Sequence, residues 1–345
     1  MKKVRIALAG TGNIAVEHAQ AIGKIRDAGL CAVYSRSMER ADSFARRFGL
    51  SAYSDYDRML EDEEIDIVDI VTVNHLHADL GIRAARAKKH IIVEKPIDIS
   101  LEKATALIDA YSVNGVKLTV ISQYRFNGAI VRIKRLVDSG HLGRLILGSV
   151  SLKWPRTQGY YDSSGGWRKS QAHAGGGVLM IQAIHLIDVL QWIMGPVDFV
   201  QGKVATLTHR IETEDLALGI IGFRSGAMGI VKATTSVPSR LPDRIEIHGD
   251  KGSVIVDDNR IVGYYLGSNS YRDRLISILR SRFFSFLPWP RGTIEKQLAD
   301  MVEAVKQDRE PLVKGEEGRK ALEIALGIYE SCQQGRTISL KEESN

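Results

Sequence analysis

The fold is decided by the stretch Val4-Arg5-Ile6-Ala7-Leu8-Ala9-Gly10-Thr11-Gly12-Asn13-Ile14-Ala15. An apolar run that ends in two glycines and continues into a helix-like segment predicts a strand, a tight turn and a helix start. Gly10 permits the turn, and Gly12 lets the backbone approach a pyrophosphate that the helix-terminal N–H groups would bind. Glycine-rich turns also join strands to helices for purely structural reasons. The predicted nucleotide-binding residues are Gly10, Gly12, Asn13 and Ile14.

Strand and helix signals alternate through the first third of the chain. Short apolar runs predict strands, and the segments between them carry apolar residues at helical spacing. This alternation is typical of a parallel, doubly wound Rossmann sheet in an α/β fold. The expected strands after the first are 29–34, 66–73, 90–94 and 117–122, and the expected helices include 41–48, 77–88 and 100–112.

The pattern changes near Gln123, after which β-like stretches follow one another with few helices between them. Such a succession predicts an open, mostly antiparallel sheet in a second, α+β domain. We therefore expect a nucleotide-binding domain at 1–122 and a substrate-binding and oligomerisation domain at 123–345. The β-like stretches are 145–154, 199–207, 216–223, 227–235, 244–248 and 253–256.

The composition is that of an ordinary globular enzyme, with 345 residues, 44% apolar and 26% charged. The two cysteines, Cys31 and Cys332, lie far apart without a CxxC spacing, which predicts a reducing compartment, the cytoplasm, and no metal site. The net charge of +6 comes from scattered basic residues without a nucleic-acid recognition motif. No apolar run long enough to span a bilayer is visible. We expect a small-molecule partner, no nucleic acid and no membrane.

Polar residues follow the ends of two expected strands. The segment Thr72-Val73-Asn74-His75-Leu76-His77 follows the strand at 66–73, and Glu94-Lys95-Pro96 closes the strand at 90–94. Ligands of open α/β sheets bind beyond the carboxyl ends of the strands, so both segments are candidates for the cofactor cleft. A proline restrains the backbone of Lys95 and would aim its side chain. A surface lysine in a turn is the structural alternative.

A third motif is the glycine run at 175–177, which opens an apolar helix. Gln182, His185 and Asp188 share one stripe of this helix at three-residue spacing. A single histidine on such a helix is usually a core residue. Three polar residues in one row beside a glycine-rich entry indicate a site instead.

Together these motifs resemble the Gfo/Idh/MocA oxidoreductase family over essentially the whole chain. The resemblance implies a Rossmann domain that binds NAD(P), and a lysine and a histidine, here Lys95 and His185, that flank the sugar carbon losing or gaining hydride. The block from Trp154 to Arg168, followed by 175–195, is similar to the branch that acts at position 3 of UDP-N-acetylhexosamines and their uronic acids. The implied cofactor residues also include Thr72, Asn74, His77, Glu94, Lys95, Gln123, Trp167 and Arg168. The expected substrate residues are Lys95, Arg156, Tyr160, Tyr161, Arg168, Gln182 and His185.

The expected chemistry is hydride transfer coupled to proton transfer. Lys95 would polarise the substrate oxygen, and His185 would act as general base or proton shuttle. The family often has proline where this chain has Val73, and aspartate or asparagine where it has Ile181. An apolar Ile181 cannot orient His185, so Asp188 or Gln182 would have to. Two other functions stay open: NAD-dependent glycoside hydrolysis, and nucleotide sensing with a degraded site.

The second strand ends in Ser35-Arg36-Ser37, where NAD enzymes typically have an acid that bonds the ribose hydroxyls. A hydroxyl and a guanidinium suit a 2′-phosphate, so Ser35 and Arg36 favour NADP slightly. Arg36 packed on the adenine would be compatible with NAD.

Residues 270–292 are least like the family. Arginines are interspersed there with apolar and aromatic residues. Leu275, Ile278, Leu279 and Arg282 fall at helical spacing, which predicts an amphipathic helix that ends before Pro288. We expect it to pack on a neighbouring subunit of a homodimer or homotetramer; a membrane surface is the alternative.

Overall fold

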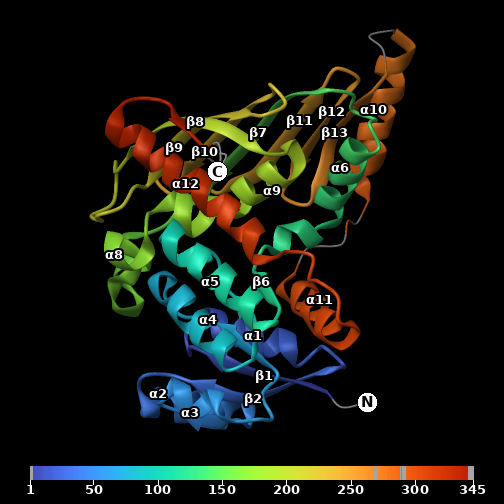
Figure 1. Ribbon diagram of the computed structural model, residues 1–345. Helices are drawn as coiled ribbons and strands as arrows, with labels where there is room; N and C mark the ends of the chain where they lie inside the picture. The colour runs from blue at the N-terminus through green and yellow to red at the C-terminus, as the bar shows by residue number, and fades with distance from the viewer. Residues whose placement is uncertain (1–2, 268–270, 288, 290–292, 341–345) are drawn as a thin grey trace. The chain divides into compact units, whose positions relative to one another are not determined.

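The computed structural model describes residues 3–267, 271–287, 289 and 293–340. The chain divides into two compact units (Figure 1). The first unit comprises residues 1–123, 172–175 and 293–322, and the second comprises 124–171, 176–292 and 323–345. Each unit contains one sheet.

The sheet of the first unit has six strands in the order β3-β2-β1-β4-β5-β6, and every pair is parallel. This is the predicted doubly wound sheet. The strand order reverses between β1 and β4, which is where such folds bind dinucleotides. The strands are β1 (Val4–Ala9), β2 (Ala28–Tyr34), β3 (Ser51–Tyr53), β4 (Ile67–Ile70), β5 (His90–Val93) and β6 (Leu118–Val120).

The helices of this unit begin and end at residues with capping chemistry. The Ser37 and Ser100 side chains accept from the N–H groups of Arg40 and Lys103, and Gly49 ends its helix in the left-handed region. The helices are α1 (Asn13–Ile22), α2 (Met38–Phe48), α3 (Tyr56–Leu60), α4 (His77–Arg86), α5 (Leu101–Asn114) and α11 (Ile294–Gln307).

Helix α11 belongs to the first unit although the sequence places it in the domain expected at 123–345. Its apolar side chains Leu298, Met301 and Val302 lie in one core cluster with Ile6 and Ile22. An amphipathic pattern shows that a helix has an apolar face but not which core receives it, so sequence periodicity could not make this assignment.

The sheet of the second unit has eight strands in the order β13-β12-β11-β7-β10-β9-β8-β14. Only β7 and β10 pair in parallel; the other pairs are antiparallel, as predicted. One face leaves Leu218, Ile220, Met228 and Ile230 exposed. The strands are β7 (Leu145–Lys153), β8 (Val197–Ala205), β9 (Leu216–Phe223), β10 (Met228–Thr234), β11 (Leu241–Gly249), β12 (Gly252–Asp257), β13 (Arg260–Leu266) and β14 (Ile338–Ser339).

The helices of the second unit include α6 (Gly128–Asp138), α7 (Gln158–Asp162), α9 (Ile184–Met194) and α10 (Tyr271–Phe286), while α8 (Gln171–Ala174) and α12 (Gly315–Gln334) contain residues of both units. A π-helical turn, Leu179–Ala183, leads into α9. The helical run Gln171–Met194 is long and apolar enough to cross a membrane, contrary to the expectation from sequence. Its most apolar window is 94% buried in the protein, as in the core helix of a globular domain.

Candidate active site

The glycine turn between β1 and α1 contains two glycines with different roles. Gly10 has φ +126°, and a Cβ there would lie 2.7 Å from the carbonyl oxygen of Val71, so the fold itself requires glycine. Gly12 has an ordinary φ of −76°, and a Cβ there would meet nothing within 4 Å. Gly12 is also the N-cap of α1 and gives no side-chain cap to its N–H groups. The turn therefore leaves room and donors for a pyrophosphate.

The end of β2 bears Ser35 and Arg36, as predicted. The Ser35 hydroxyl accepts from the N–H of Ser37 at 3.4 Å, and the backbone N–H of Ser35 donates to the carbonyl of Tyr53. Arg36 is exposed. This edge of the sheet presents a hydroxyl and a guanidinium at the position where a ribose is bound in such folds.

A buried histidine that the sequence analysis did not single out ties the turn helix to the Glu94-Lys95-Pro96 loop. His18 of α1 lies between two carboxylates: its Nδ1 is 2.7 Å from Asp69 of β4, and its Nε2 is 3.2 Å from Glu94. His18 and Asp69 are fully buried, and Glu94 is nearly so. The other carboxylate oxygen of Glu94 accepts from the backbone N–H of Lys95 at 2.9 Å. We call His18, Asp69 and Glu94 the buried triad.

The protonation of the buried triad follows from its geometry. Burial alone would lower the pKa of His18, but the charges and hydrogen bonds of Asp69 and Glu94 outweigh it and raise the pKa to about 10. Burial raises the pKa of Asp69, whereas the His18 ring lowers it. Because His18 faces a carboxylate on each side, we place the proton on the ring, which then donates from both nitrogens.

The predicted residues after β4 link two loops of the first unit. His77 is fully buried, with Nδ1 2.7 Å from the Pro96 carbonyl and Nε2 3.2 Å from the Thr72 carbonyl. The Asn74 amide donates to the carbonyl of Ala174 at 2.9 Å. In this structure His77 and Asn74 hold the backbone around the predicted cleft, and a direct cofactor contact by either stays a prediction.

Lys95 is half-buried and precedes a cis peptide bond to Pro96. Glu94 uses its carboxylate to hold His18 and the Lys95 backbone, so we assign it a positioning role in the site. The side-chain oxygen of Gln123 is buried with no hydrogen-bond partner among the described residues. Such an oxygen can accept a hydrogen bond from a ligand, which suits the predicted cofactor role of Gln123.

Four of the predicted substrate residues lie together in the second unit. The Tyr160 ring lies under two guanidinium groups, 4.8 Å from Arg156 and 4.9 Å from Arg168. Its hydroxyl accepts from the Gln182 amide at 3.1 Å. Arg168 also covers the ring of Trp167 at 4.7 Å. Cation–π contacts hold the arginines in place while their N–H donors remain in the plane of each guanidinium. We call Arg156, Tyr160, Arg168 and Gln182 the arginine–tyrosine cluster.

Tyr161 packs edge-on against the Tyr160 ring, with centroids 5.1 Å apart. Its side chain is fully buried, its hydroxyl is bonded to Thr235 at 2.8 Å, and burial raises its pKa to about 12. The sequence predicts that both tyrosines contact substrate because the family block contains them, but consecutive residues of a short helix point in different directions. We therefore assign Tyr161 a packing role.

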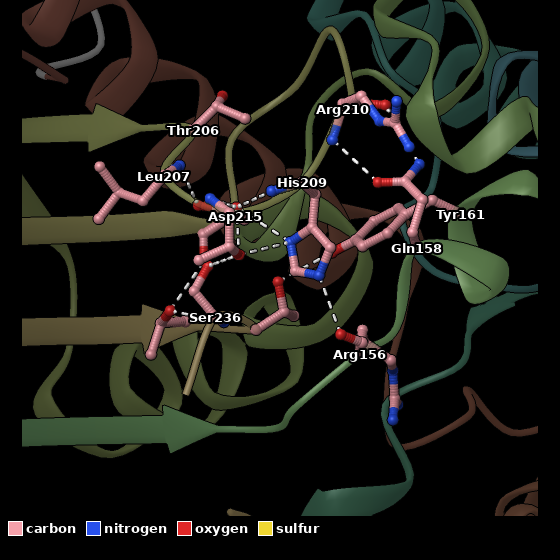
Figure 2. Close-up of polar contacts among 12 residues, drawn as sticks. Arg156, Gln158, Tyr161, Thr206, Leu207, His209, Arg210, Asp215 and Ser236 are labelled. Carbon is pink, nitrogen blue, oxygen red and sulfur yellow. Dashed lines mark hydrogen bonds and ion pairs between the residues drawn. The ribbon is translucent and has the colours of Figure 1, made fainter. Parts of the chain in front are cut away.

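The backbone of Arg156 is anchored by a buried acid that the sequence analysis missed. Figure 2 shows Asp215 accepting from the N–H groups of Leu207 and His209, while the His209 ring joins Asp215 at 2.9 Å to the Arg156 carbonyl at 2.9 Å. Burial would raise the pKa of Asp215, but these hydrogen bonds outweigh it and hold the pKa well below its usual range. The network fixes where the Arg156 side chain starts.

His185 of α9 is nearly buried and stacks on the Tyr124 ring, with centroids 5.3 Å apart and planes 13° apart. The Tyr124 hydroxyl donates to Asp243 at 2.9 Å, and the Trp154 indole donates to the other oxygen at 2.6 Å. Burial raises the pKa of Asp243 to about 6. Tyr124 and Asp243 also line a cavity of about 930 Å³ together with Arg240 and Arg260.

The sequence signal for Asp243 is its place in β11. Asp243 lies on the same inward face of the strand as Ile245 and Ile247, so a carboxylate interrupts an apolar stripe. Tyr124 gives no comparable signal.

Asp188 accepts from Arg125 with both carboxylate oxygens, at 2.8 and 2.6 Å. Gln182 bonds to Tyr160. Orientation of His185 by Asp188 or Gln182 stays a prediction, and the His185 ring also stacks on Tyr124. Ile181 lies in the π-helical turn before α9, a local widening often found at functional sites.

The glycine run before α9 is required by close packing. The Glu214 carboxylate accepts from the N–H groups of Gly177 and Leu179 at 2.7 and 2.8 Å, capping the helix start. A Cβ on Gly177 would lie 1.8 Å from the Glu214 carbonyl oxygen. The run thus lets a buried acid reach the helix terminus. Among the described residues no cluster could hold a metal ion.

Residues 4–122 match the family model described as an oxidoreductase family, NAD-binding Rossmann fold, and residues 130–255 match the GFO/IDH/MocA C-terminal domain. The chain belongs to the Gfo/Idh/MocA oxidoreductase family. It is accordingly an NAD(P)-dependent oxidoreductase of the sugar dehydrogenase type, as the sequence predicted.

Two similar solved structures are WlbA dehydrogenases in complex with NADH and UDP-GlcNAcA. The one from Chromobacterium violaceum is 30% identical, with a TM-score of 0.89, and the match covers 100% of this chain and 98% of that one. The one from Bordetella pertussis is 29% identical, with a TM-score of 0.88 and coverage of 99% and 100%. The myo-inositol 2-dehydrogenase of Thermotoga maritima is 26% identical over 348 residues, covering 98% of this chain and 99% of the relative.

The two glycines give a matched pair of substitutions. Gly12→Val places a side chain in open space, so we expect stability to change by no more than about 1 kcal/mol while NAD(P) binding is lost. Gly10→Ala forces a Cβ against Val71 at a left-handed φ and should cost about 1–3 kcal/mol of stability. Chemical denaturation and cofactor titration separate the two effects. Normal nucleotide binding by Gly12→Val would refute the assignment of this turn.

The buried triad predicts a pH dependence. The His18 ring releases its proton near pH 6.5 when unfolded and near pH 10 when folded, so the folded state holds more protons between these values. The free energy of unfolding therefore falls as pH rises through this window. His18→Ala removes this fall and costs about 3–5 kcal/mol, because two buried carboxylates lose their cation. Equal pH slopes for both proteins in urea unfolding would contradict a charged His18.

Proposed function

We propose that the protein oxidises or reduces carbon 3 of a nucleotide sugar, in the class of UDP-linked N-acetylhexosamines and their uronic acids. The arginine–tyrosine cluster carries the proposal. Arg156 and Arg168 flank one aromatic ring, and planar guanidinium groups bind carboxylates and diphosphates through paired donors. The WlbA structures, which are described with UDP-GlcNAcA bound, support the same class.

The roles of the chain's own residues follow from the chemistry. Bound NAD(P) supplies the hydride acceptor or donor. As a carbinol carbon loses hydride, its hydroxyl must lose a proton, and we assign Lys95 to hold that oxygen and His185 to take the proton. Tyr124 orients the His185 ring by stacking on it. Asp243 holds Tyr124 in turn by accepting a hydrogen bond from the Tyr124 hydroxyl. Gln123, Gly12 and Arg36 would hold the cofactor.

A free cyclitol is the second candidate substrate. The myo-inositol 2-dehydrogenase relative aligns over nearly the whole of both chains, and a cyclitol needs no anion-binding arginines. We also propose that the enzyme works in the cytoplasm, since Cys31 and Cys332 are both free thiols.

The test of both candidates is a substrate panel. UDP-GlcNAc, UDP-GlcNAcA, myo-inositol and levoglucosan are each incubated with NAD⁺ and NADP⁺ while the reduced-nicotinamide absorbance is followed. Turnover of the nucleotide sugars that falls in Arg156→Ala and Arg168→Ala supports the proposal. Turnover of free polyols that survives both substitutions favours the cyclitol. Sugar release without net reduction indicates hydrolysis, and cofactor binding without turnover indicates a sensor.

In the same assay Lys95→Ala should lower kcat by about 100-fold or more, the scale of a positioned acid–base group, with little change in cofactor affinity. His185→Asn should also lower turnover. Lys103→Ala is the matched control, because Lys103 lies on α5 and pairs with Asp79 at the surface. Wild-type turnover in Lys95→Ala would remove Lys95 from the mechanism.

Cofactor preference is tested at Arg36. If Arg36 binds a 2′-phosphate, Arg36→Ala should weaken NADP binding by about 1.5–3 kcal/mol, the range for hydrogen bonds to charged groups, and NAD binding much less. Calorimetric titration with both nucleotides measures this. Equal losses would show that Arg36 packs on the adenine instead.

A further inference from the structure

Helix α10 exposes a stripe of apolar side chains. Leu279 is 67% exposed, Phe283 61% and Phe286 86%, and Leu275 and Ile278 on the same stripe are about half exposed. The side that packs on β13 is made partly of serines: Ser277 and Ser281 are buried, and the Ser281 hydroxyl bonds to the backbone of Tyr264. A helix that buries serines and exposes leucine and phenylalanine does not obtain its stability from this surface alone, so the exposed stripe needs an apolar environment.

Arginines lie beside this stripe. A cavity of about 810 Å³ opens between α6, β13 and α10, and three arginines line it: Arg132 and Arg135 from α6 and Arg280 from α10. Among the described lining residues there is no carboxylate. The Nε of Arg132 is buried without a hydrogen-bond partner among the described residues, while its Nη2 donates to the Tyr264 hydroxyl at 3.3 Å.

The chemistry of the cavity changes along its wall. Leu279, Phe283 and Phe284 complete it on the α10 side, so cationic donors and exposed apolar side chains share one opening. A ligand that suits both has an anionic head and an apolar tail.

We propose that this surface docks on an anionic lipid bilayer, with lipid phosphates bound by the arginines and the α10 stripe inserted among the acyl chains. We call it the docking surface, defined by Arg132, Arg135, Arg280, Leu275, Ile278, Leu279, Phe283 and Phe286. A helix with an exposed apolar stripe and flanking cations is suited to lie in the interface plane. The cytoplasmic leaflet supplies the complementary negative charge.

A second copy of the chain fits less well. A two-fold contact through α10 would bring the same arginines of both copies together with no described carboxylate in the cavity to compensate. Helix α10 is also separate from the exposed apolar residues of β9 and β10, which lie four or more strands from β13 in the sheet order. The docking surface is independent of the substrate proposed above.

The test uses the full chain and sedimentation with vesicles of phosphatidylcholine alone or mixed with phosphatidylglycerol. We expect binding to the anionic vesicles and not to the neutral ones, weakened by added salt because the arginine contacts are screened. The variant Leu279→Ser/Phe283→Ser/Phe286→Ser and the variant Arg132→Gln/Arg135→Gln should each reduce binding by about tenfold or more. Thermal unfolding checks that each variant is folded.

Matched controls carry the same changes elsewhere. Val113→Ser/Leu312→Ser replaces exposed apolar residues, 84% and 49% exposed, outside the docking surface, and Arg46→Gln/Arg47→Gln removes two exposed arginines of α2. Both should bind vesicles like the wild type. If the serine variant is smaller in analytical ultracentrifugation and the wild type does not bind vesicles, a second copy covers α10 and the proposal is overturned. Binding of inorganic diphosphate without vesicle binding would also overturn it, as would equal binding to both kinds of vesicle.

Discussion

One buried cation, the His18 ring, joins the helix of the nucleotide-binding turn to two strands of the sheet. His18 on α1 lies between Asp69 of β4 and Glu94 at the end of β5, so a single ring joins the helix behind the glycine turn to the two strands whose ends form the cleft. Desolvating three ionisable groups is costly, and the arrangement is stable only because both ring nitrogens donate. Glu94 passes this constraint to the backbone of Lys95. The residue that we assign to catalysis is thus positioned from within the core.

The sequence predicts the parts of this unit that depend on local pattern. The Gly10 turn, the strand alternation and the serine caps at Ser37 and Ser100 each have a signature a few residues long. The buried triad has no such signature. Asp69 and Glu94 lie 51 and 76 positions from His18 in the sequence, and the three residues meet only after the sheet has formed. A polar residue in an apolar strand or helix face marks such a group but does not name its partner.

The second unit shows the same division. The arginine–tyrosine cluster could be predicted because the family resemblance groups its members, and the same resemblance added Tyr161, whose side chain is fully buried in the structure. The contact between Tyr124 and Asp243 could not be predicted, since 119 positions separate these residues and neither belongs to a motif. The return of α11 to the first unit was missed for a related reason: periodicity gives an apolar face, and only packing selects its core.

Two sets of arginines serve different ends in this chain, and their surroundings distinguish them. Arg156 and Arg168 stack on Tyr160, and the Arg156 backbone is held by a network through His209 and Asp215, which suits recognition of one anion in one pose. Arg132, Arg135 and Arg280 line a cavity beside exposed leucine and phenylalanine side chains. Guanidinium groups stacked on an aromatic ring favour recognition of one anion, whereas guanidinium groups beside an exposed apolar stripe favour a repetitive anionic surface.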